Sequence, residues 1–177
     1  MLYSPLFWIA CAVLLFWAVG AYNRLVRLRS AAIQAFGGLD AHLVRMQAML
    51  AECDAAHAGA EGVVEQARMA LQGAATQFGA NLAVARARPL QPAGAAALST
   101  GRDVLDAAWA QLLRVREDED GPAAVITWRQ RWEEHQAQSR VAVEQFNDAV
   151  AQYNAAITQF PARLLAWLFG FTPAKAL

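Results

Sequence analysis

The sequence has few of the residues that would support several common classes of protein. It has two cysteines, a single lysine among 15 basic residues, and 15 acidic residues that bring the formal net charge to zero. A neutral chain is poorly suited to wholesale binding of nucleic acid, so we expect no nucleic-acid partner. Cys11 and Cys53 are too far apart along the chain for a disulfide, and both are expected to be buried free thiols.

Recognisable catalytic patterns are missing as well. The chain contains no Gly-x-Ser-x-Gly, no His-Glu-x-x-His and no phosphate-binding glycine loop. Its three histidines, His42, His57 and His135, are far apart in the sequence. Asp54 and His57 have the i,i+3 spacing of a di-iron ligand pair, but the second such pair that a di-iron bundle needs is missing. The sequence therefore predicts no enzyme, no metal site and no bound cofactor.

Support for a β-sheet is equally weak, because no segment alternates apolar and polar residues and β-branched residues are scattered. Apolar residues make up 57% of the chain and charged residues only 17%. This skew comes from an apolar N-terminal run and from a large number of alanines downstream. Alanine is the best helix former and adds little bulk, so we predict an all-α fold of closely packed helices.

The apolar run from Leu2 to Ala21 contains no charged residue. About twenty residues at ~1.5 Å each match a hydrocarbon core of ~30 Å, and only a helix satisfies the backbone of a single span in lipid. A cleaved signal peptide is the alternative, with Ala18 and Gly20 near the cleavage site. However, no basic residue precedes the run, as a signal peptide requires. We predict a transmembrane anchor over residues 1–21.

Three arginines, Arg24, Arg27 and Arg29, follow the run directly, whereas no lysine or arginine precedes it. The positive-inside rule then places the N-terminus outside and the remainder of the chain in the cytoplasm. The predicted location is a single pass of the bacterial cytoplasmic membrane.

Four amphipathic helices are predicted after the anchor: to about Ala58, over residues 61–88, from about Ser99, and over residues 122–160. Steps of three and four between apolar residues mark each of them. In the first helix these are Leu25, Leu28, Ala32, Phe36, Leu39, Leu43, Met46, Leu50 and Cys53, and in the fourth Val143, Phe146, Val150, Tyr153, Ile157, Phe160, Leu164 and Trp167. The acidic run Glu117–Asp120 is interpreted as part of a solvated loop.

Short connections favour an antiparallel up-down-up-down bundle over residues 22–160. The fourth helix is long enough to return to the membrane at Pro161, so residues 161–177 are predicted to form an apolar, aromatic tail in the membrane interface. The same topology places a set of basic residues at the membrane end, where each would gain ~1 kcal/mol from acidic lipids. This set is Arg24, Arg27, Arg29, Arg86, Arg88, Arg102, Arg163 and Lys175.

Residues near both ends of the predicted bundle resemble the LemA family, which also has one N-terminal span followed by a long antiparallel helical bundle. They are Tyr22, Asn23, Phe146, Asn147, Tyr153, Asn154, Phe160, Pro161, Phe169, Gly170 and Phe171. Phe36 and Phe146 stand where members usually have Trp and Tyr, so the chain resembles a divergent member. The family has no settled biochemical activity, and the resemblance implies association with a membrane.

The signature residues also have a structural interpretation. Phe146, Tyr153 and Phe160 share one seam of the fourth helix, with Asn147 and Asn154 beside it. We predict that these asparagines fix the register of the bundle through side-chain hydrogen bonds. The alternative is a polar stripe that recognises a partner helix.

Together these features predict a structural, scaffolding or protein-interaction module at the membrane. Its expected partners are the lipid bilayer and other membrane or cytoplasmic proteins, or copies of itself. The alternative is a lipid- or small-ligand-binding module, with an acyl chain held in the alanine-lined interior or by the interfacial tail.

Overall fold

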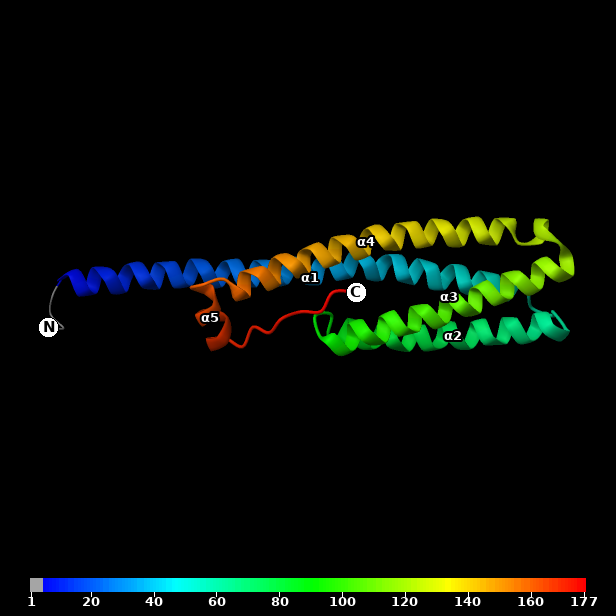
Figure 1. The fold of residues 1–177 in the computed structure, drawn as a ribbon, viewed down its shortest axis with the longest axis horizontal. Helices are drawn as coiled ribbons and strands as arrows, with labels where there is room; N and C mark the ends of the chain where they lie inside the picture. Colours follow the sequence, from blue (N-terminus) through cyan, green and yellow to red (C-terminus); the bar gives the residue numbers. More distant parts are fainter. Residues whose placement is uncertain (1–4) are drawn as a thin grey trace.

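The computed structural model describes residues 5–177 and is helical almost throughout (Figure 1). The elements are α1 (Pro5–Ala56), α2 (Gly62–Ala87), α3 (Pro92–Asp120), the short 3-10 helix η1 (Pro122–Ala124), α4 (Ile126–Thr158) and α5 (Ala162–Leu168). The four long helices run antiparallel to their chain neighbours, which confirms the predicted all-α bundle with a long N-terminal helix. Leu2, Tyr3 and Ser4 of the predicted anchor lie outside the described residues.

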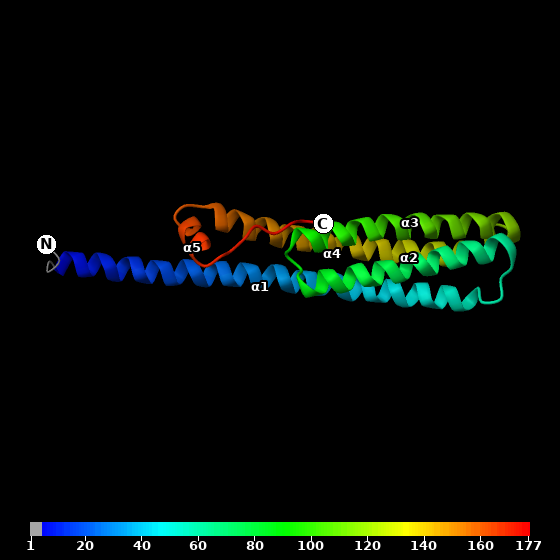
Figure 2. The same ribbon diagram turned by 90° about the horizontal axis from the view of Figure 1, so that it is seen from below.

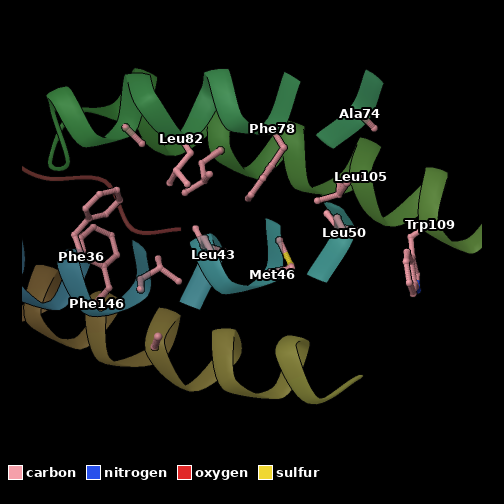
Figure 3. Packing of buried hydrophobic residues seen from close by; sticks show 14 of the residues in the cluster. Phe36, Leu43, Met46, Leu50, Ala74, Phe78, Leu82, Leu105, Trp109 and Phe146 are labelled. Atoms are coloured by element: carbon pink, nitrogen blue, oxygen red, sulfur yellow. The ribbon is translucent and has the colours of Figure 1, made fainter. Parts of the chain in front are cut away.

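The bundle is built from two close helix pairs, α1 with α4 and α2 with α3. Larger side chains fill the space between the pairs, as Figure 3 shows for Phe78 and Leu82 of α2 opposite Leu43 and Met46 of α1. All four side chains are buried. These leucine, methionine and phenylalanine side chains fill the core between the two pairs.

The predicted apolar stripes agree with the buried residues along most of the bundle. In α1, Leu25, Ala32, Phe36, Leu39, Leu43, Met46, Leu50 and Cys53 are all buried. In α4, Phe146, Val150, Tyr153 and Ile157 are buried. Phe160, Leu164 and Trp167, predicted to continue the same seam, are exposed, because α4 ends at Thr158 and the chain turns before α5 begins at Ala162.

Two predicted element boundaries are wrong. Helix α3 begins at Pro92 instead of about Ser99, because proline is well tolerated in the first helical turn, where its missing N–H is not needed. The acidic run Glu117–Asp120 is the last turn of α3, not a loop. Arg116 pairs with Asp120 at 2.5 Å, and Arg129 of α4 pairs with Glu117 at 2.8 Å, so cations balance the run.

The α2–α3 hairpin covers only the part of the α1–α4 pair that is far from the anchor (Figures 1 and 2). At ~1.5 Å per residue, α2 with its 26 residues is roughly 39 Å long, whereas α1 from Tyr22 to Ala56 is roughly 52 Å long. The hairpin therefore stops short of the membrane end. Helix α5 and the residues after it occupy the stretch that the hairpin leaves uncovered.

Candidate functional site

The N-terminal part of α1 projects beyond the rest of the molecule (Figure 1). Its most apolar 18-residue window has no buried residue and is long enough to cross a membrane. Large side chains such as Trp8 and Phe16 are 65% and 80% exposed, and Cys11 is exposed on the same segment. Such a surface is stable only when something apolar covers it, and α1 passes from it into the bundle core without a break.

The membrane end of the bundle carries fewer basic residues than predicted. Arg86 pairs with Asp40 at 2.7 Å, and about 28 Å of helix, at ~1.5 Å per residue, separates Asp40 from Ala21. Arg88 lies directly after α2, and Arg102 bonds to Gln136 further along the bundle. These three residues sit away from the membrane end because the α2–α3 hairpin is too short to reach it. Of the predicted set, Arg24, Arg27, Arg29 and Arg163 remain near the anchor, on the first turns after Ala21 and on α5. Lys175 lies further along the bundle, between Ala174 and Leu177, which bond to Asn154 and Asn147 of α4.

The last seven residues, 171–177, form a strap that contains no helix or strand and lies along α4. Asn154 donates a hydrogen bond from Nδ2 to the carbonyl of Ala174 and accepts one at Oδ1 from the N–H of Ala174, both at 2.9 Å. Asn147 makes the same two bonds, also at 2.9 Å, with Leu177. Each asparagine therefore satisfies both backbone groups of one strap residue, as a neighbouring β-strand would.

The spacing of the two asparagines matches the spacing of the strap residues. Seven residues of helix between Asn147 and Asn154 cover ~10.5 Å at ~1.5 Å each. Three residues of extended chain between Ala174 and Leu177 cover ~10 Å at ~3.3 Å each. Because the two repeats agree, one straight helix binds an extended chain at two points. The asparagines thus bind the chain's own C-terminus and do not set helix register as predicted.

Tyrosines hold the beginning of the strap. The hydroxyl of Tyr153 donates to the carbonyl of Thr172 at 2.9 Å, and burial raises the pKa of this tyrosine above its ordinary value. The ring of Tyr22 on α1 lies 4.8 Å from that of Phe169 and 6.0 Å from that of Phe171. Gly170 between them has φ 70°, a conformation that favours glycine.

Most of the signature residues are therefore brought together at this end of the bundle. Phe146 is fully buried and packs edge-on against Phe36, at 5.8 Å between ring centroids. Phe160 is 82% exposed at the end of α4, and Asn23 is exposed with no hydrogen bond to any residue from 5 to 177. The segment 161–177, predicted as one interfacial tail, is divided. Helix α5 stays beside the anchor, and the strap runs away from it towards Phe36.

Two of the cavities along the bundle combine apolar and charged side chains in their walls. One, of about 370 Å³, opens at the membrane end between α1 and the end of α4. The other, of about 320 Å³, lies between the two helix pairs, and its wall includes Leu43, Phe78, Leu98, Arg102 and the C-terminal Leu177. Three polar side chains beside the second cavity form a chain of hydrogen bonds, in which Arg102 donates to Gln136 and Nε2 of Gln136 donates to Asp106 at 2.9 Å. Burial raises the pKa of this carboxyl.

Asp54 and His57, which have the spacing of a metal-ligand pair, contact other groups of the protein. Asp54 bonds to Arg68 at 2.5 Å, while Nδ1 of His57 lies 2.6 Å from the carbonyl oxygen of Cys53. Burial raises the pKa of the Cys53 thiol to about 12, so it stays protonated. Within residues 5–177, no group of three or more His, Cys, Asp and Glu side chains is arranged to hold a metal ion.

The strap itself was not foreseen from the sequence. A periodic pattern identifies which helix face is buried, but it does not show that a side-chain amide meets backbone thirty residues further on. The usable signal was the pair of asparagines at a seven-residue spacing beside a non-helical Thr-Pro segment at the C-terminus.

Comparison with known proteins gives one result. No curated protein and no solved structure matches the chain. The LemA family matches residues 63–177, which include α2 to α5, the strap and every C-terminal signature residue. The match begins after α1, so it does not include Tyr22 and Asn23. This chain belongs to the LemA family.

Proposed function

We propose that this protein is a membrane-tethered structural and interaction module, which holds other proteins or further copies of itself at the bacterial cytoplasmic membrane. The observation that carries the proposal is the continuity of α1, a single helix of 52 residues that is exposed and apolar at one end and buried in the bundle at the other. A continuous helix couples the bundle rigidly to the anchor. It presents the bundle surface at distances up to ~50 Å from the membrane, at ~1.5 Å per residue.

Charge supports an orientation with the bundle in the cytoplasm. Arg24, Arg27, Arg29 and Arg163 cluster near the anchor, while the first acidic residue of the chain is Asp40 and the last is Asp148. A membrane end with cations and no acid favours the acidic cytoplasmic leaflet.

Exposed aromatic and aliphatic side chains support a second membrane contact at α5. Phe160, Leu164 and Trp167 are 82%, 62% and 83% exposed, and α5 contacts α1 just after the anchor. A short helix with such a surface is stabilised by lying in the interface, with its tryptophan at the level of the headgroups. The chain would then contact the bilayer through both α1 and α5.

The orientation is tested with single cysteines in a Cys11→Ala, Cys53→Ala background. Glu119→Cys places a thiol at the far end of the bundle, and a short hydrophilic extension ending in cysteine, added before Met1, places one on the other side of the anchor. In intact cells, an impermeant thiol reagent should label the extended variant and leave the Glu119→Cys variant unlabelled until the cells are opened. Labelling of the Glu119→Cys variant in intact cells would place the bundle outside.

The interaction role is tested in cells with photo-crosslinking residues placed at exposed bundle positions such as Val104 and Val141, which are 50% and 54% exposed. Reproducible crosslinked species at one face, whether to the same chain or to one partner, are the expected result. The purified full chain should then show the same species after mild detergent extraction. A strictly monomeric protein with no crosslinked species would contradict the proposal.

The cavity between the helix pairs favours a small-ligand-binding role as the second candidate. It combines an apolar wall with the polar chain of Arg102, Gln136 and Asp106. Native mass spectrometry of the delipidated protein would support this role if a bound molecule survives in the wild type and is lost when Leu98→Trp fills the cavity.

A further inference from the structure

The cavity at the membrane end forms because α4 ends early. α4 stops at Thr158 and the chain turns away through Gln159, Phe160 and Pro161, so the face of α1 from Trp17 to Arg24 loses its cover. The result is an open groove of about 370 Å³ with α1 on one side and the end of α4 on the other.

The groove spans the boundary between the apolar and the charged parts of α1. Its lower wall is formed by Trp17, Gly20 and Ala21 of the span, and its upper wall includes Arg24, the first charged residue of the chain. Phe160 belongs to the wall formed by the end of α4 and the turn after it. Gly20 leaves space, since a Cβ built there meets no atom within 4 Å.

The polar groups of the groove fit an anion. A guanidinium binds a phosphodiester through two parallel hydrogen bonds, and the amide of Gln159 offers a further donor beside it. No acidic residue lies nearby in the chain, because α1 has none before Asp40 and α4 has none after Asp148. Arg27, one turn further along α1, and Arg163, at the start of α5, add positive charge around the opening.

We infer that this groove binds one acidic phospholipid of the bilayer, with its phosphodiester on Arg24 and Gln159 and one acyl chain along Gly20 between Trp17 and Phe160. The apolar lower wall selects a lipid over a free phosphate, because a free anion would leave that wall without an apolar partner. The inference rests on the anchor and the groove, and it does not depend on the interaction role proposed above.

The test compares four full-length proteins: the wild type, Arg24→Gln, Gly20→Leu and the matched control Arg29→Gln. Arg29 carries the same charge at the same end but lies five residues from Arg24, on a different face of α1, and does not line the groove. Each protein is reconstituted in nanodiscs of equal parts phosphatidylcholine and phosphatidylglycerol, and native mass spectrometry then counts the lipids retained by each released chain.

The wild type should retain one phosphatidylglycerol in preference to phosphatidylcholine. Arg24→Gln should reduce that retention about tenfold. Gly20→Leu should remove both lipids, and Arg29→Gln should behave as the wild type. Equal loss of phosphatidylglycerol in Arg24→Gln and Arg29→Gln would show that the lipid is attracted by the overall charge and not bound at a site. Unchanged lipid retention in Gly20→Leu would show that the lipid does not occupy the groove. Either result overturns the inference.

Two further measurements keep the test decisive. Circular dichroism should show equal helix content in all four proteins, so that a loss of lipid cannot be attributed to unfolding. Phosphatidylglycerol carrying a photoactivatable group on its acyl chain should crosslink to Ala156, a buried residue of the groove wall, in the wild type and not in Gly20→Leu. Absence of that crosslink, or displacement of the lipid by inorganic phosphate, would also overturn the inference.

Discussion

The two asparagines that hold the strap predict a measurable local opening of the chain. Asn147 and Asn154 each make two hydrogen bonds to strap backbone that is partly buried. Removing one side chain leaves both backbone groups of a strap residue unpaired, at a cost of about 1–2 kcal/mol for a site that water partly reaches. Since ~1.4 kcal/mol is tenfold, Asn154→Ala should increase the open population of the strap about 5- to 30-fold. The double variant Asn147→Ala, Asn154→Ala should increase it about 30-fold or more.

The composition of the chain supplies a specific assay. Lys175 is the only lysine, and it lies between the two residues that the asparagines hold. A lysine-specific endoproteinase therefore has one cleavage site, and each cut removes Ala176 and Leu177, which intact mass spectrometry detects. When opening and closing are fast, the cleavage rate follows the open population, so the rate should rise by the factors given above.

A matched control separates the clamp from general destabilisation. Asn23 is a signature asparagine that is exposed and bonded to no described residue, so Asn23→Ala should leave the cleavage rate unchanged. Tyr153→Phe loses the single bond to Thr172 and should give a smaller increase than Asn154→Ala. If the double variant is cleaved within twofold of the wild-type rate, the asparagines do not hold the strap and the reasoning fails.

Three other perturbations have defined outcomes. Phe78 is fully buried between the helix pairs, so Phe78→Ala should lower the free energy of unfolding by about 3–5 kcal/mol. A decrease under ~1 kcal/mol in chemical denaturation would contradict the central place of this side chain in the core. Burial lowers the pKa of His135 below its ordinary value of 6.5, so on acidification the unfolded chain binds a proton before the folded chain does. The free energy of unfolding should therefore fall as the pH drops below about 6.5. His135→Gln should weaken this pH dependence in denaturation curves measured at several pH values. The exposed ion pair of Arg86 and Asp40 should contribute little to stability, so Asp40→Asn should change the free energy of unfolding by less than ~1 kcal/mol. A larger loss would show that this pair holds the end of the α2–α3 hairpin against α1.

Helix positions and faces could be predicted because they depend on local periodicity. The alternating steps from Leu25 to Cys53 place one face of α1 in the core, and the structure buries that face almost without exception. Helix starts were harder to predict, since the third helix was expected from about Ser99 although α3 begins at Pro92, a residue well tolerated in the first turn.

The level of each charged residue along the bundle depended on how far each helix reaches. Arg86 was expected at the membrane and lies beside Asp40, because α2 is shorter than the part of α1 that follows the anchor. The exposure of the apolar residues after α4 also depends on where a helix ends. Phe160, Leu164 and Trp167 continue the apolar period in sequence, yet the turn at Pro161 moves them out of the seam.

The sequence by itself determined the anchor, the all-α class, the seams and the family, because hydropathy and period are properties of neighbouring residues. Only the tertiary structure decided where the chain's C-terminus lies and what its signature residues bind. The bonds from Asn147 to Leu177 and from Asn154 to Ala174 join backbone to side chain across 30 and 20 residues. They exist because a short hairpin leaves one stretch of the α1–α4 pair uncovered and the strap fills it. The anchor helix is likewise a local feature, but the groove beside it required the end of α4 to be known.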